Sequence, residues 1–122
     1  MIEQYTLVDL EKERLDGHKW IFGPFKSENS SEFTNAIEIG YINLQQVEQT
    51  DRLHFHSNSD EYYFILSGHM QIKVGESIVE MSEYQLLRVR PNVPHLILGV
   101  QPDTRILLIK APPSLNDKTI IS

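Results

Sequence analysis

The sequence predicts an all-β protein of antiparallel strands, and three observations carry this prediction. From residue 36 onward, short runs that alternate apolar and polar residues recur about every 8 to 12 residues. Polar or glycine-containing stretches typical of turns, such as SNSD (57–60) and VGES (74–77), separate these runs. The best helical pattern, VDLEKERL (8–15), covers about two turns, so the chain lacks the crossover helices that parallel strands require.

The segments on either side of these runs have a different character. HKWIFGPF (18–25) indicates extended structure, and SENSSEFTN (27–35) is typical of a polar loop. PPSLNDKTIIS (112–122) is expected to be a tail whose last residues are loosely held. The runs that predict strands are AIEIGYINL (36–44), RLHFHS (52–57), EYYFIL (61–66), MQIKV (70–74), SIVEM (77–81), LLRVR (86–90), HLILGV (95–100) and TRILLIKA (104–111).

The domain organisation follows from this layout. A chain of 122 residues has the size of one domain with one core. We divide it into an N-terminal extension, residues 1–35, and a single barrel domain, residues 36–122. Residues 36–110 are expected to form the body of the barrel, with about six to eight antiparallel strands. The extension is expected to pack on the barrel or on a dimer partner.

Composition excludes several classes of partner. The formal net charge of −6 argues against a nucleic-acid or anionic-membrane partner, since either would favour a basic face. No apolar run approaches the roughly 20 residues needed to span a bilayer, and the N-terminus lacks the pattern of a secretory signal. The count of zero cysteines excludes disulfides and thiolate metal sites. We therefore expect a cytoplasmic protein that acts on a small molecule.

The most informative stretch is HFHSNSDEYYFILSG (54–68). Alternate residues of a strand share a face, so His54 and His56 point to one side and Phe55 to the other. Glu61 opens the next predicted strand, where its carboxylate meets the imidazoles if the two strands are neighbours. Two imidazoles and a carboxylate suit divalent Fe, Mn, Ni, Cu or Zn. The alternative is that the His-x-His pattern decorates a solvated strand face.

A second segment, VRPNVPH (89–95), places another histidine after a stiff turn. Pro91 and Pro94 restrict the backbone, and Asn92 is a residue type that tolerates a left-handed conformation. The turn therefore directs the side chain of His95, which opens the next predicted strand.

Together these segments resemble the two motifs of the cupin superfamily, in particular small single-domain cupins of the cupin 2 conserved-barrel type. The first motif reads His-x-His, three or four residues, Glu, six residues, Gly. It is matched here by His54, His56, Glu61 and Gly68. His95 matches the histidine that ends the second motif, Pro-x-Gly-x-x-His.

The chain also departs from these motifs, but no departure removes one of the four matched ligand positions. What the departures leave open is the subfamily, because the residues around His95 also shape the mouth of a pocket. The departures are Glu48 and Tyr84 at the opening glycines, Arg90 at a proline, Asn92 at the internal glycine and Gly99 at the closing asparagine.

The resemblance implies a jelly-roll barrel, or double-stranded β-helix, that holds one divalent transition metal ion. The implied ligands are His54, His56, Glu61 and His95. Three neutral imidazoles and one carboxylate leave a divalent ion with a net charge near +1 and with open positions for a small ligand. Which metal is bound, among Fe, Mn, Zn, Ni and Cu, stays open.

Three further residues are candidates for catalysis. Tyr63 shares the strand face of Glu61 and is expected to line the barrel interior, where it either donates to a substrate or only packs. Arg88 and Arg90 alternate with apolar residues. If they face inward, they can clamp a carboxylate bidentately; if they face outward, they are ordinary solvated side chains.

The sequence favours a metal-dependent enzyme, most plausibly oxygenase-like, that acts on a small polar or anionic organic molecule. An oxygenase is favoured because no separate general base is evident. The alternatives are a metal-dependent isomerase or decarboxylase, and a non-catalytic ligand-binding or regulatory module. The apolar cluster of Trp20, Phe22 and Phe25, together with the resemblance, predicts a homodimer.

Overall fold

The computed structural model describes residues 4–13, 17–47, 51–114 and 116–121, and it is built almost entirely from strands. The first antiparallel sheet contains, in spatial order, β1 (Gly17–Phe22), β2 (Glu38–Leu44), β9 (Thr104–Ala111), β4 (Asp60–Ser67) and β7 (Leu86–Val89). The second contains β10 (Lys118–Ile120), β3 (His54–His56), β8 (His95–Val100), β5 (Met70–Val74) and β6 (Ser77–Met81).

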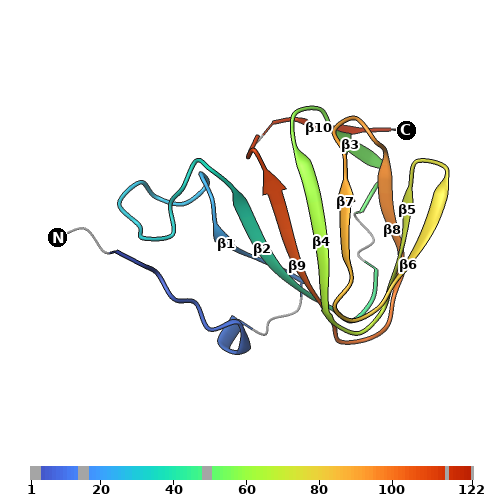
Figure 1. Cartoon of the computed structure of the whole chain (residues 1–122), viewed down its shortest axis with the longest axis horizontal. Coiled ribbons are helices and arrows are strands. Elements are labelled where there is room, and N and C mark those ends of the chain that lie inside the picture. The colour runs from blue at the N-terminus through green and yellow to red at the C-terminus, as the bar shows by residue number, and fades with distance from the viewer. Residues whose placement is uncertain (1–3, 14–16, 48–50, 115, 122) are drawn as a thin grey trace.

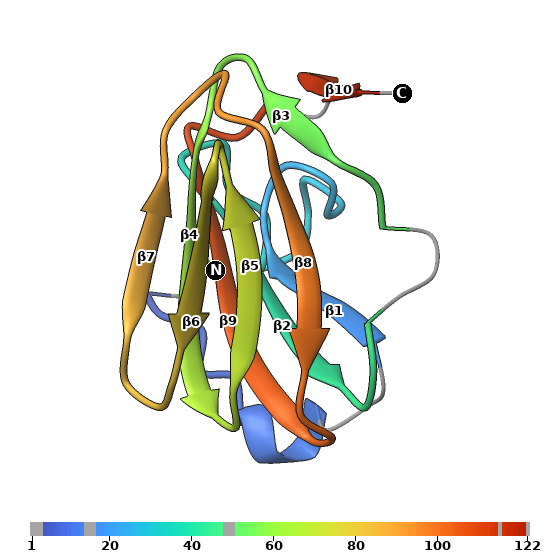
Figure 2. The same ribbon diagram turned by 90° about the vertical axis from the view of Figure 1, so that its right-hand side faces the viewer.

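These two five-stranded sheets face each other as a jelly-roll barrel, so the predicted fold class is confirmed (Figures 1 and 2). In the segment with the best helical pattern, residues 8–15, the described part forms a 3-10 turn, η1 (Leu10–Glu13), and residues 14 and 15 lie outside the described residues. Within the described ranges, no helix has the length and apolar character needed to cross a membrane.

The predicted body, residues 36–110, holds β2 through β9, and β9 ends one residue later. The sequence did not reveal that each sheet gains a strand from outside this body. β1 pairs with β2, and β10 pairs with β3 (Figures 1 and 2). The expectation of a loosely held tail is wrong, because Ile121 N–H donates to the carbonyl of Leu53 at 2.9 Å beyond the end of β10.

Strand alternation builds the core between the two sheets. In β4 and β9 every second residue is buried, which is the pattern of strands with one face on the core. Ile65 and Ile106 from these strands are fully buried, and they belong to one apolar cluster with Met70 and Ile72 of β5. Other members of this cluster, Ile42, Leu44, Tyr63 and Leu108, also line a cavity inside the barrel.

Two turns adopt the left-handed backbone conformation at positions where the motifs carry glycine. Asn92 has φ 68°, as expected from the sequence, and its N–H donates to the carbonyl of His56 at 2.8 Å. Tyr84 has φ 63° and donates to the carbonyl of Ile65 at 2.8 Å. The turn before β8 is thereby hydrogen-bonded to the end of β3, which fixes the two histidine-bearing strands relative to each other.

Candidate metal centre

Strands from both sheets bring the predicted ligands together. β3 supplies His54 and His56, β4 supplies Glu61, and β8 begins with His95, which lies opposite His54 in the β3–β8 pair. Each residue offers one ligand atom, and these atoms all lie within 4.8 Å of one another. All four residues are buried, which excludes the alternative of histidines on a solvated strand face.

The hydrogen bonds of the three imidazoles point their second nitrogens at a common centre. Carbonyl and carboxylate oxygens only accept, so an Nδ1 beside one of them carries the proton and leaves the Nε2 lone pair free for a metal. The Nδ1 contacts are the carbonyl of Arg52 for His54 (2.6 Å), the carboxylate of Asp117 for His56 (3.1 Å) and the carbonyl of Val93 for His95 (3.0 Å).

The carboxylate of Glu61 is held ionised among these rings. Its Oε1 accepts a hydrogen bond from the Tyr63 hydroxyl at 2.8 Å and lies 2.8 Å from His95 Nε2. Its Oε2 lies 3.5 Å from His56 Nε2. Burial by itself raises the pKa of Glu61, but the hydrogen bonds from His95 and Tyr63 and the charges of the imidazoles outweigh it and lower the pKa.

The histidines divide into two kinds. Burial lowers the pKa of His54 and of His56, so both are neutral at neutral pH, which is the form that coordinates a metal. Burial also acts to lower the pKa of His95, but the hydrogen bond to Glu61 and its charge outweigh it and raise the pKa. Three imidazole nitrogens and one carboxylate form a donor set that fits a divalent transition metal of the Fe, Mn, Zn, Ni or Cu group.

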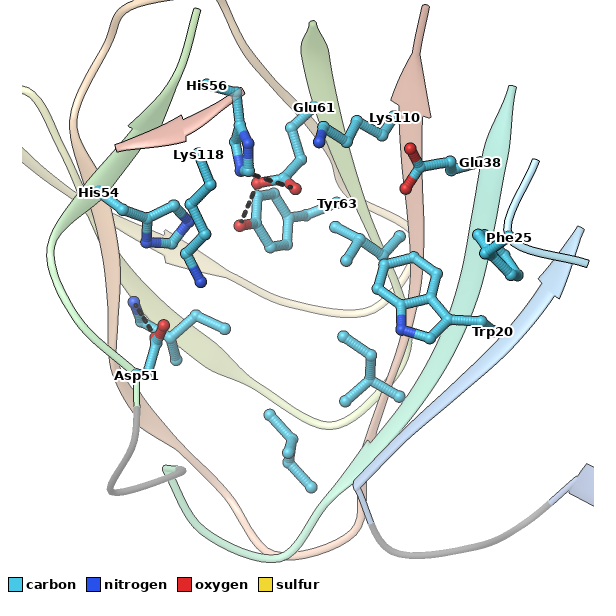
Figure 3. A pocket seen from close by; sticks show the side chains of 14 residues that line it. Trp20, Phe25, Glu38, Asp51, His54, His56, Glu61, Tyr63, Lys110 and Lys118 are labelled. Atoms are coloured by element: carbon cyan, nitrogen blue, oxygen red, sulfur yellow. Dashed lines mark hydrogen bonds and ion pairs between the residues drawn. The ribbon is translucent and has the colours of Figure 1, made fainter. Parts of the chain in front are cut away.

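The site opens into a cavity of about 440 Å³ in the barrel (Figure 3). His54, His56 and Glu61 line one end of it. Trp20 and Phe25 line the opposite end, so the aromatic cluster of the N-terminal extension forms part of the cavity wall. A cavity of this size admits one small molecule beside the ion.

The catalytic candidates fall in different places. Tyr63 lines the cavity and is almost fully buried, and burial together with the charge of Glu61 raises its pKa well above the ordinary range. Arg88 is exposed and its Nε donates to the Asp60 carboxylate at 2.9 Å on the outer face. Arg90 is exposed as well. The structure therefore does not bring either arginine to the cavity.

Sequence reasoning missed the charged residues around the site, which are Glu38, Asp51, Lys110 and Lys118 in the cavity lining and Asp117 beside His56. Lys110 and Glu38 line the cavity, and their strand parity was a usable signal, because they lie on the same strand faces as the buried residues Leu108 and Ile42. Asp117 gave no signal, since it lies in the segment read as a tail.

Asp117 joins the site to the strand that follows it. Its Oδ1 accepts from Lys110 Nζ at 2.8 Å and lies 3.1 Å from His56 Nδ1, and its Oδ2 accepts from Asn58 N–H at 3.1 Å. Burial by itself raises the pKa of Asp117. The hydrogen bonds from Lys110, Asn58 and His56 outweigh it and lower the pKa to about 2. The ionised Asp117 therefore orients His56 in the way that outer-sphere carboxylates orient metal-bound histidines.

Solved structures with the same fold share little sequence with this chain. A Streptomyces nucleoside dehydratase, Pac13, is 17% identical over 72% of this chain and 70% of its own, with a TM-score of 0.63. A protein from Planctomyces limnophilus is 18% identical over 94% and 96%, with a TM-score of 0.64. Bacillus subtilis oxalate decarboxylase is 17% identical over 71% of this chain and 24% of its own, with a TM-score of 0.60.

No curated protein sequence gives a significant match to the chain. The family profile described as Cupin domain matches residues 40–108, which include both motif segments, all four candidate ligands and most of the barrel body. This match covers more than half of the sequence and agrees with the fold and with the position of the histidine cluster. The chain therefore belongs to the cupin domain family.

Proposed function

We propose that this cupin is a metal-dependent enzyme that acts on a small polar organic molecule held in the cavity. The observation that carries the proposal is the common orientation of His54, His56 and His95, whose Nδ1 atoms are all engaged, so that three Nε2 atoms and the Glu61 carboxylate converge beside the cavity. A solvated or purely structural cluster has no need for three imidazoles in the same tautomer.

The ion, when bound, supplies a Lewis acid or redox centre for an oxygen-bearing ligand. The protein contributes orientation and exclusion of water. Tyr63 holds the Glu61 carboxylate in place through its hydroxyl, and His56 is held by Asp117. Apolar side chains such as Ile42 and Leu108 line the cavity beside the site and keep it dry.

An oxygenase reaction is the first candidate, as the sequence suggested. A metal-dependent isomerase, decarboxylase or other lyase is the second candidate. The sequence showed no separate general base, but Glu38 and Lys110 place ionisable groups in the cavity. Fold relatives named as a nucleoside dehydratase and an oxalate decarboxylase support an enzymatic role for this architecture, while their identities of 17% leave the reaction to be measured.

The test uses protein purified without a histidine tag and loaded with iron or manganese. It is incubated with small carboxylates, diketones and phenols, with and without oxygen, and oxygen uptake and products are measured. Oxygen-dependent product formation supports the oxygenase, and turnover without oxygen supports the second candidate. His56→Ala should abolish turnover, while His69→Ala, outside the cluster, serves as the matched control. Tight ligand binding without any turnover would reassign the protein as a binding module.

We also propose that the chain forms a homodimer. Trp20 and Phe25 line the chain's own cavity. The apolar surface that supports a dimer therefore lies in the segment before η1, where the side chains of Tyr5 and Leu7 are 80% and 87% exposed. Light scattering at micromolar concentration should give twice the single-chain mass of 14.2 kDa, and a mass near that of one chain would overturn this proposal.

A further inference from the structure

The cavity contains a buried carboxylate that the metal site does not use. Glu38, the first residue of β2, is 5% exposed and lines the cavity. Figure 3 shows its carboxylate on the side of the cavity away from His54, above the ring of Trp20. Among the residues that the structure describes, no group donates a hydrogen bond to its Oε1. A buried charged oxygen without a donor is costly, so a group that donates to it is favoured there.

The nearest cation does not meet this need. Lys110 Nζ donates to the carbonyl of Ser114 and to the carboxylate of Asp117, both at 2.8 Å, and no ion pair joins it to Glu38 in the described part of the chain. Burial raises the pKa of Glu38, and the charge of Lys110 together with a hydrogen bond from the backbone of Ser114 only partly opposes this. The lysine therefore serves Asp117 and leaves Oε1 of Glu38 without a donor.

Beside this carboxylate lie two aromatic rings, tilted by 59° to each other. Trp20 of β1 sits opposite Gly40 of β2, and its ring lies so close that a Cβ on Gly40 would come within 2.9 Å of it. Phe25 packs against Trp20 with ring centroids 5.6 Å apart. Both rings line the cavity together with Glu38 (Figure 3). Aromatic faces of this kind favour stacking with a ring-shaped ligand.

We propose that Glu38, Trp20 and Phe25 form a recognition site for a ring-bearing ligand that presents a hydroxyl or amino donor to the Glu38 carboxylate. The ligand's other end offers oxygen atoms to the metal centre, so this inference rests on the proposed metal-dependent function. The substrate class is thus a hydroxylated or aminated ring with one oxygen-rich end. A ligand with a carboxylate at each end is disfavoured, because its second carboxylate would face Glu38.

The test compares simple ring probes on the cobalt-loaded protein, followed by absorption spectroscopy and calorimetry. The parent probe is 2-hydroxybenzoate, which offers two oxygens to the ion. The comparison set adds one hydroxyl at each remaining ring position, with the methoxy counterpart of each compound. A hydroxyl donates to a carboxylate and a methoxy group does not, so we expect at least one hydroxylated probe to bind roughly ten-fold more tightly than its methoxy counterpart.

In Glu38→Gln this preference should shrink to less than about two-fold. Glu76→Gln, an exposed carboxylate in the turn between β5 and β6, is the matched control and should keep the full preference. Phe25→Leu should weaken all ring probes alike and keep the ratio. A preference that survives in Glu38→Gln, or that is missing in the wild type for every isomer, overturns the inference.

Two further readouts separate the possible failures. If no probe perturbs the cobalt spectrum of the wild type, the proposed metal function fails, and the recognition site falls with it. If the parent probe binds but no preference appears, only the recognition site fails. Thermal unfolding identifies a purely structural role: Glu38→Gln should unfold at the same or a higher temperature, because an ionised buried carboxylate opposes folding. A clear loss of stability and of metal content would overturn the proposal.

Discussion

The two ends of the cavity are built in different ways. The metal end comes from β3, β4 and β8, and its four side chains belong to two short motifs that the sequence shows directly. The opposite end takes Trp20 from β1 and Glu38 from β2, and Asp117 joins His56 to Lys110 from a segment just before β10. Chemistry is thus encoded locally, whereas recognition and support depend on strands that pair across the whole chain.

The largest effect is expected when one ligand is removed from the metal end. His56→Ala should lower metal affinity by more than the roughly 10- to 100-fold that loss of an outer-sphere partner costs, because a direct ligand disappears. The measurement is elemental analysis after dialysis against a weak chelator. His69→Ala is the control, since His69 pairs with Glu80 on the outer face. Equal metal loss in both variants would show that the ligand set is wrong.

The second prediction concerns the support that the final strand region gives to the metal end. Asp117→Asn keeps the shape of the side chain but removes the charge that favours the Nδ1–H tautomer of His56. We expect about a ten-fold loss of metal affinity, measured by competition with a chelator. Asp103→Asn, at an exposed turn residue with φ 61°, is the matched control. An unchanged affinity in Asp117→Asn would remove Asp117 from the site.

The third prediction follows from the pKa of about 2 for Asp117, which lies below the ordinary value of 3.8. A depressed carboxyl pKa stabilises the folded state above pH 4, and this contribution disappears as the pH falls from about 4 to 2. It amounts to about 2 kcal/mol. Urea unfolding of the metal-free protein at pH 5 and at pH 2 should therefore show a smaller pH dependence in Asp117→Asn. The same pH dependence of the unfolding free energy in the variant and the wild type would contradict this prediction.

The smallest effect is expected at Arg88. Its ion pair with Asp60 is exposed on the outer face, where water and salt screen it, so Arg88→Ala should leave the free energy of unfolding almost unchanged. Ligand binding and turnover should stay at wild-type levels, because the side chain does not line the cavity. Loss of activity without loss of metal would revive the carboxylate clamp that the sequence allowed.

What the sequence revealed depended on how local the signal was. Strand alternation and the spacing of His54, His56 and Glu61 were enough for the fold class and the metal end. Asn92 was predicted to be left-handed because its residue type tolerates that conformation, whereas Tyr84 adopts φ 63° without any such preference. There the tertiary contact with Ile65 overrides local propensity, and no pattern within the turn reports it.

The charged residues of the cavity show where parity was underused. Lys110 and Glu38 lie on the buried faces of their strands, among core residues. A charge on the buried face of a strand is a signal for a polar pocket. Asp117 is different, because its partners lie 61 and 7 residues away in the sequence and no periodicity links them. The pairing of β10 with β3 had to be seen before the residue acquired a role.

The absence of a side chain at Gly40 determines how a substitution at this position would change the width of the cavity. The indole of Trp20 occupies the space that any Cβ at this position would need, so alanine there would displace the ring toward the ligand. The metal ligands lie on other strands and would keep their places. One codon in β2 thus adjusts the width of the cavity independently of its chemistry, which makes it a natural first position to randomise when variants are selected for smaller substrates.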